Sequence, residues 1–152
     1  MSKLKVSVTA VPGVCRSQNR ALAWVTVEGD KDVNAGEEIA RIAAEMGKER
    51  RDVWSRFDHW LAGNNDAPKL FHTWSDPDCR GLFVFKWRVG AERRRLYGFF
   101  MHPKANNRAF LTCVLFHYGT KAEWSTDPLA KKKFQQLRAM QDVQMAITKA
   151  FA

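Results

Sequence analysis

Residues 82–118 constrain the fold of this chain more than any other segment. Three apolar stretches, rich in aromatic and β-branched side chains, lie at residues 82–89, 95–101 and 109–118. This composition is typical of β-strands. Gly90-Ala91-Glu92 supplies a turn after the first stretch, and residues 102–108 supply a longer loop before the last. The segment therefore predicts an antiparallel meander.

Basic side chains are set into these same stretches. Alternation predicts that Phe83, Phe85, Trp87 and Val89 face the core, which leaves Val84, Lys86 and Arg88 together on the other face. Because a sheet holds its side chains at fixed positions, cations on it can bind phosphates with a defined geometry. The candidate phosphate-binding residues are Lys86, Arg88, Arg93, Arg94, Arg95 and Arg108.

The remaining elements complete an α+β pattern. Residues 4–9 and 21–27 predict two strands, whose pairing the long polar connection leaves open. Asn34 is a candidate N-cap for a helix that ends at residues 63–66, with Gly47 as a point of division. Further predicted elements are a strand at 70–74 and a helix after the candidate N-cap Asp127, with Pro128 in its first position.

We therefore expect one α+β domain over residues 1–152, with residues 1–30 as an N-terminal extension and 31–152 as the core. Its antiparallel sheet has about four core strands, and the extension adds strands of its own. The sheet is packed with an N-terminal helix or helical hairpin and with a C-terminal helix.

The charge balance favours a polyanionic partner. Lys and Arg number 25 against 16 Asp and Glu, for a formal net charge of +9, which favours nucleic acid. No apolar run approaches the ~20 residues that span a bilayer, and the start of the chain lacks the apolar stretch of a secretory signal. We expect a cytoplasmic protein with no membrane partner.

The cysteines indicate neither a disulfide framework nor a zinc ribbon. Cys15, Cys79 and Cys113 are odd in number and form no C-x-x-C pair. The alternative is a metal site made by Cys113 and His117 with a distant His59 or His72, although such spacing has little specificity. We expect no metal and no cofactor.

Four short motifs together resemble a known family. They lie at residues 81–89, 94–100, 115–121 and 127–129, the last leading into a helix. The residues of these motifs and their order along the chain resemble those of the RelE/HigB-like toxins over roughly residues 37–137. Members of that family are small bacterial ribosome-associated mRNA interferases, built as helices packed on an antiparallel sheet and neutralised by an antitoxin. The resemblance implies RNA, the ribosome and an acidic antitoxin as partners.

The resemblance also assigns residues. Lys86 and Arg88 match the basic residues of the family's central strand, and Arg94 or Arg95 matches the arginine that opens the next strand. The family often places histidine or basic residues after its last strand, where this chain has His117, Tyr118 and Lys121.

Metal-free RNA cleavage needs a group that takes the proton of the 2′-hydroxyl, cations for the phosphate and an acid for the leaving oxygen. Under this hypothesis Lys86, Arg88 and Arg94 bind the phosphate. His117 transfers the proton, because histidine titrates near neutrality, and His102 is a weaker candidate. A base stacks on Tyr97 or Tyr118.

Alternatives stay open at this point. A sheet histidine with a satisfied hydrogen bond is an equally good interpretation of His117. Tyr97 is alternatively a core residue. The whole chain is alternatively a non-catalytic nucleic-acid-binding or ribosome-binding module. It is alternatively a protein-interaction domain, phage-encoded, that docks an acidic partner on its basic surface. RNA cleavage discriminates among these alternatives.

Overall fold

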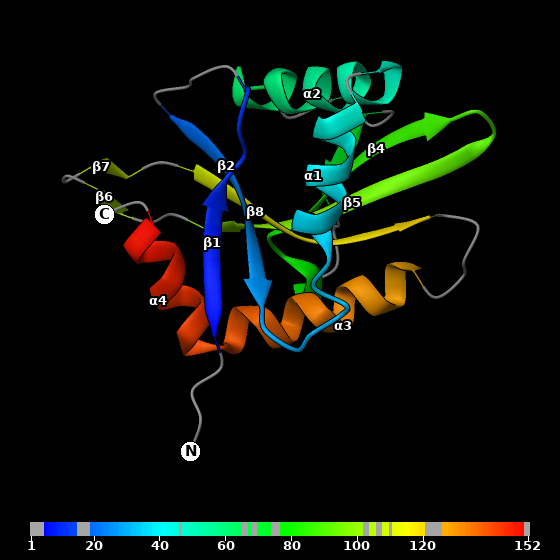
Figure 1. The fold of residues 1–152 in the computed structure, drawn as a ribbon. Coiled ribbons are helices and arrows are strands. Elements are labelled where there is room, and N and C mark those ends of the chain that lie inside the picture. The colour runs from blue at the N-terminus through cyan, green and yellow to red at the C-terminus, as the bar shows by residue number, and fades with distance from the viewer. Residues whose placement is uncertain are drawn as a thin grey trace.

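A six-stranded sheet with helices on both faces forms the protein, as the computed structural model shows (Figure 1). The structure describes residues 5–14, 19–45, 47–64, 67, 70–73, 77–101, 104–105, 108–109, 111–120 and 126–150. The strands of the sheet are β1 (Val6–Ala10), β2 (Arg20–Val27), β3 (Phe71–Thr73), β4 (Leu82–Val89), β5 (Glu92–Met101) and β8 (Leu111–Thr120). Their spatial order is β1-β2-β8-β5-β4-β3, and β6 (Lys104–Ala105) with β7 (Arg108–Ala109) forms a separate pair.

The predicted meander is confirmed. The pairs β3–β4, β4–β5 and β5–β8 are all antiparallel. The turn between β4 and β5 contains Gly90, whose φ of 61° is one that glycine adopts without a steric penalty. Strands β1 and β2 also pair antiparallel, which settles the pairing that the sequence left open.

The prediction of a wholly antiparallel sheet is wrong, because the sheet is mixed. Strand β2 lies parallel to β8, with Leu22 opposite Cys113 and Trp24 opposite Leu115. Parallel neighbours need a long crossover, and here all of the chain between β2 and β8 supplies it. The N-terminal hairpin thus joins the sheet beside β8, at the opposite end of the meander from β3.

The helices form the outer two layers. α1 (Ala35–Glu45) and α2 (Lys48–Leu61), divided at Gly47, cover one face and bury Phe83, Phe85 and Trp87 as predicted. The prediction is wrong for Val89, which is 38% exposed because it is the last residue of β4, next to the turn. The expected single C-terminal helix is divided at Met140 into α3 (Thr126–Ala139) and α4 (Gln141–Ala150), which close the core on the other face. None of the described helices combines the length and apolarity that a membrane span requires.

The buried side chains lie in two core clusters, one between the sheet and α1–α2 and a second between the sheet and α3–α4. The second cluster covers part of the face of β4 that carries the cations. Val84 lies on the same face as Lys86 but is fully buried with Phe134 of α3. The face that carries the cations is therefore covered at one end of β4 and uncovered at its other end, toward the β4–β5 turn.

Asn34 lies just before α1, as predicted, and its carbonyl accepts the N–H of Glu38. Its side-chain oxygen accepts the backbone N–H of Tyr118 at 2.8 Å, and its side-chain nitrogen donates to the Tyr118 carbonyl at 3.3 Å. The asparagine side chain thus fixes the start of α1 to β8 instead of capping its own helix.

Candidate nucleic-acid interface

Four cations share one face of the β4–β5 hairpin. Lys86 lies opposite Arg95, and Arg88 lies opposite Arg93. Residues directly opposite each other in an antiparallel pair have neighbouring side chains on one face, and positions two apart return to that face. We call these four residues the cationic quartet.

Members of the quartet differ in exposure. Arg88 and Arg93 are exposed near the turn, Lys86 is half-buried, and Arg95 is only 7% exposed. Within the described part of the chain, the side chains of Arg88 and Arg93 form no ion pair and no hydrogen bond. Their charges are therefore available to a ligand.

A cavity of about 730 Å³ lies beside the quartet. Of the ten described residues that line it, seven are basic and one is acidic; the set is Lys48, Asp52, Arg56, Leu70, Lys86, Trp87, Arg88, Arg93, Arg94 and Arg95. Strand β3 pairs with β4 at residues 83–85, and the backbone N–H of Lys86 donates to the Leu70 carbonyl at 2.8 Å. Beyond Lys86, no strand among the described residues lies beside this edge of β4. The cavity lies where this edge approaches α2.

Arg56 joins the two walls of the cavity. Its Nε donates to the Lys86 carbonyl at 2.6 Å, and its Nη1 donates to the backbone carbonyl of Asp52 at 2.9 Å. Burial lowers the pKa of Arg56, and the nearby charge of Asp52 opposes this shift. An arginine remains charged under such a shift. Arg56 therefore links α2 to β4 and also contributes a positive charge to the cavity.

Arg94 borders the cavity but belongs to the opposite face of the hairpin, where it lies across from Trp87. Its Nη1 donates to Glu49 at 2.7 Å, and its Nε donates to Glu92 at 2.6 Å. Burial by itself lowers the pKa of Arg94, but the bonds to Glu92 and Glu49 outweigh it and raise the pKa. Two carboxylates thus compensate the charge of Arg94.

Glu49 is the centre of this second network. Besides Arg94 it accepts Nε1–H of Trp87 at 2.8 Å and Nη2–H of Arg41 at 3.1 Å. Arg41 also pairs with Glu38 and, at 2.9 Å, with Glu45. Burial would raise the pKa of Glu49, but its three donors together lower it.

His117 lies within the sheet layer and does not line the cavity. It is 5% exposed, its Nδ1 is 2.7 Å from the carbonyl oxygen of Asp32, and its ring centroid is 5.9 Å from that of Tyr97. His117 shares a face with Tyr97, whereas Arg94 lies on the other face. The structure therefore separates His117 from Arg94 and brings Lys86 together with Arg88, Arg93 and Arg95.

Neither tyrosine that was expected to stack on a base lines the cavity. Tyr97 is fully buried, so its ring lies out of reach of a ligand. Tyr118 is half-buried, with its ring centroid 6.2 Å from that of Trp87. Burial raises the pKa of Tyr118, and the charge of Glu38 adds to this shift.

The other predicted residues fall outside what the structure describes. Lys121 and His102 lie outside the described residues, and for Arg108 only the backbone, in β7, is described.

Three lining residues of α2 were missed by sequence reasoning. Lys48, Asp52 and Arg56 follow one another at intervals of four, so they share one helix face. The interval of four along the helix is the sequence signal that could have found them.

Across the described ranges, no group of three or more His, Cys, Asp or Glu side chains is arranged to hold a metal ion. Cys113 is fully buried in the core under α1 and α2, and burial raises the pKa of its thiol. His117 lies on the other face of the sheet, so the alternative pairing of these two residues at one metal is not formed.

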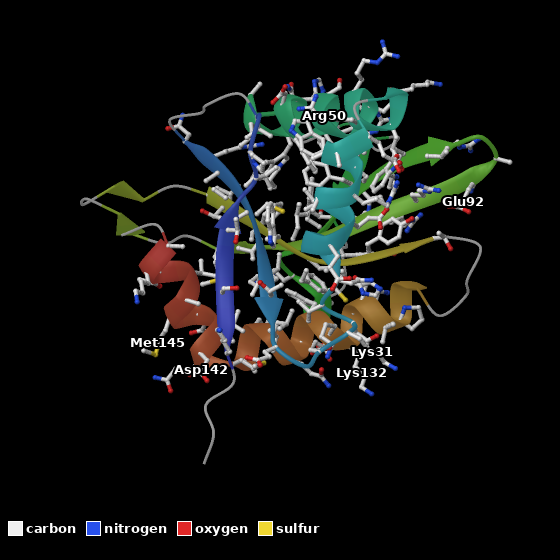
Figure 2. All side chains as sticks on the ribbon, viewed as in Figure 1. Lys31, Arg50, Glu92, Lys132, Asp142 and Met145 are labelled. Atoms are coloured by element: carbon white, nitrogen blue, oxygen red, sulfur yellow. The ribbon has the colours of Figure 1, made fainter. Side chains whose placement is uncertain are left out.

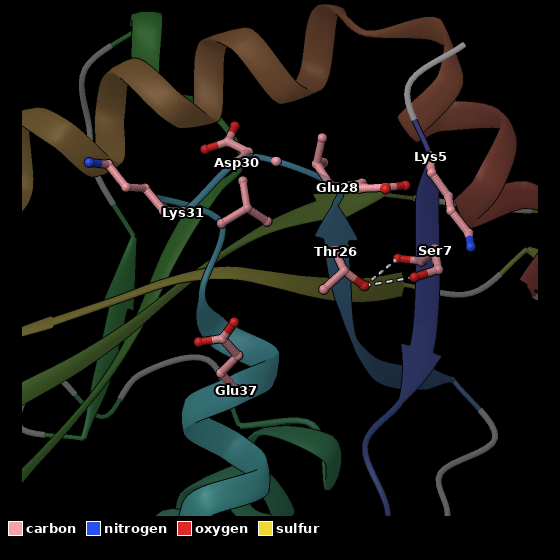
Figure 3. A pocket seen from close by; sticks show the side chains of 10 residues that line it. Lys5, Ser7, Thr26, Glu28, Asp30, Lys31 and Glu37 are labelled. Carbon is pink, nitrogen blue, oxygen red and sulfur yellow. Dashed lines mark hydrogen bonds between the residues drawn. The ribbon is translucent and has the colours of Figure 1, made fainter. Parts of the chain in front are cut away.

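A second cavity, of about 530 Å³, offers a different environment (Figure 3). Lys5 and Lys31 line it together with Glu28, Asp30 and Glu37. Asp30 also pairs with a lysine of α3, Lys133, at 2.7 Å. Since charges of both signs alternate there, this cavity has no preference for a polyanion.

Comparison of the chain with protein-family models, curated proteins and solved structures finds no match. The fold and the site therefore define this protein by themselves, as an α+β protein with a basic cavity near the turn of its β4–β5 hairpin.

Proposed function

We propose that this protein binds RNA and that the sugar–phosphate backbone lies in the basic cavity between α2 and the β4–β5 hairpin. One observation carries the proposal: seven of the ten lining residues are cations, and Arg88 and Arg93 have no ion-pair partner among the described residues. A groove lined with cations is how proteins follow a nucleic-acid backbone, and phosphate contacts supply most of the affinity.

The arrangement of the quartet suits consecutive phosphates. Its two cross-strand pairs are one pleat repeat apart, about 6.8 Å along an antiparallel strand. A concave site at a sheet edge suits a single strand better than a duplex, whose backbone is convex. The resemblance to RelE/HigB-like toxins favours RNA over DNA, with the β3-β4-β5-β8 meander and the α1–α2 pair as the RelE-like core.

Cleavage of mRNA on the ribosome is the second candidate function. The observation that favours it is that Lys86 and Arg88, which the resemblance assigns to RNA, both line the cavity. In this candidate the quartet stabilises the charge that develops on the phosphate, and an acidic antitoxin neutralises the toxin by covering the same cations. Binding without cleavage is the function that the described geometry supports best, since His117 lies outside the cavity.

The test of binding uses a labelled single-stranded RNA titrated at several salt concentrations. Each lost phosphate contact lowers the slope of log affinity against log salt by about 0.7 for a single strand. The double variant Arg88→Ala/Arg93→Ala is expected to lose about twice that slope and at least tenfold in affinity. The matched control, Lys132→Ala/Lys149→Ala, removes two exposed cations outside the cavity and is expected to keep the wild-type slope. Equal losses in both variants would contradict a localised site.

The test of cleavage adds the same proteins to a reconstituted translating system and maps the message by primer extension. Cuts within translated codons that vanish in Arg88→Ala would establish the interferase. Intact message together with salt-dependent RNA binding would establish a binding module.

A further inference from the structure

Among the described residues that line the basic cavity, Asp52 alone supplies a carboxylate. Lys48 precedes Asp52 by one helical turn and Arg56 follows it by one turn, so the expected role of the carboxylate is an ion pair on the surface of α2.

The structure does not form that ion pair. The guanidinium of Arg56 donates to two backbone carbonyls, those of Lys86 and Asp52, at 2.6 and 2.9 Å. Within the ranges that the structure describes, the Asp52 carboxylate has no hydrogen bond and no ion pair. A half-buried acid thus borders the cavity with its acceptor oxygens unused.

A phosphate is the wrong ligand for this carboxylate, because the two anions repel each other. An ionised carboxylate only accepts hydrogen bonds, so its match is a donor on the ligand. Each ribonucleotide carries such a donor beside its phosphate, the 2′-hydroxyl, and this group distinguishes RNA from DNA.

We propose that Asp52 accepts a hydrogen bond from a ribose 2′-hydroxyl and thereby makes the cavity select RNA over DNA. The inference rests on the proposed binding of RNA in this cavity. With DNA in the same place, the carboxylate meets a polyanion with no donor to compensate it. The negative charge of Asp52 therefore weakens the binding of DNA. With RNA, the hydrogen bond from the 2′-hydroxyl compensates the repulsion between the carboxylate and the phosphates.

The experiment measures the affinity of the full chain for three oligonucleotides of one base sequence: ribose, 2′-deoxyribose and 2′-O-methylribose. Because the bases are identical, a donor on a base cannot produce a difference. A hydrogen bond to a charged group corresponds to roughly a tenfold difference in affinity. We expect the wild type to bind the ribose strand about that much more tightly than the other two.

Asp52→Ala is expected to bring the three affinities to within about twofold, chiefly because the deoxyribose and 2′-O-methyl strands bind more tightly. Asp52→Asn retains an acceptor oxygen and is expected to keep part of the preference. The control, Asp142→Ala, removes one negative charge from exposed α4, on the helical layer opposite α2 (Figure 2), and is expected to keep the wild-type ratio.

Two outcomes overturn the inference: equal binding of all three strands by the wild type, or an unchanged preference for ribose in a folded Asp52→Ala variant. Failure to bind any of the strands is a different result, since it would refute the proposed function itself.

Discussion

Arg94 and Glu49 lie 2.7 Å apart, Nη1 to Oε2, and join β5 to the first turn of α2. Glu49 is 11% exposed at its side chain, so this ion pair is largely shielded from water. The same turn of α2 begins the helix face that carries Lys48 and Asp52 into the cavity. Arg94, which is predicted to bind phosphate, lines the cavity, and its bond to Glu49 also fixes the position of α2 against β5.

Removal of the charge at Glu49 is expected to destabilise the protein. Glu49→Gln loses the charge of an acceptor that three donors share, those of Arg41, Trp87 and Arg94. Hydrogen bonds to charged groups contribute about 1.5 to 3 kcal/mol each, and we expect a total loss of about 3 kcal/mol in the free energy of unfolding. Urea denaturation measures it. Glu45→Gln, at a carboxylate that is 56% exposed, serves as control and should change it by less than about 0.5 kcal/mol.

The contribution of Glu49 to stability is expected to disappear in acid. The pKa of Glu49 is lower in the folded protein than in the unfolded chain, where it is about 4.3. The stabilisation is therefore fully present above that value and is lost as the pH falls through the folded pKa. The difference in free energy of unfolding between wild type and Glu49→Gln should be constant near neutrality and shrink below about pH 4. A difference that grows in acid would contradict this assignment.

Glu92 is expected to weaken RNA binding. It lies at the start of β5, beside the β4–β5 turn (Figure 2), and its carboxylate pairs with Arg94 at 2.6 Å. Glu92→Gln removes an anion next to the cavity, and we expect RNA affinity to rise about threefold, as for a unit charge near a protein surface. Fluorescence titration measures the change, with Asp142→Asn as the control that alters net charge equally. An equal gain in both variants would show that only net charge matters.

His117 is expected to matter for stability and not for RNA binding. His117→Ala removes a ring that is 5% exposed and its hydrogen bond with the Asp32 carbonyl, at a cost of about 2 to 4 kcal/mol. The folded fraction of this variant should bind RNA with wild-type affinity. If the folded variant loses an RNA-cleaving activity that the wild type has, His117 is catalytic after all.

Half of the quartet could be derived from the sequence, because alternation is a local rule that places Lys86 and Arg88 on one face. The other half could not, because the observed turn has two residues where three were predicted, and this register sets Arg93 and Arg95 opposite Arg88 and Lys86. The partners of Arg94 could not be derived, since Glu49 lies in a helix far away along the chain and no local pattern records that contact.

The second helical layer had a signal that was not used. Leu82, Phe83, Val84 and Phe85 form an unbroken apolar run, which is typical of a strand covered on both faces. All four are buried, two in each core cluster. The parallel pairing of β2 with β8 could not be predicted in this way, because no residue pattern in either strand specifies which strand lies beside it.

That parallel pair places a constraint on how the chain is made. Arg20 pairs with Leu111, so β2 has no neighbour on its inner edge until the ribosome has synthesised β8, residues 111–120 of 152. Contacts between residues so far apart form slowly, and an exposed strand edge is a site of aggregation while it waits. The N-terminal hairpin is thus the first part of the sheet to be translated and among the last to be completed.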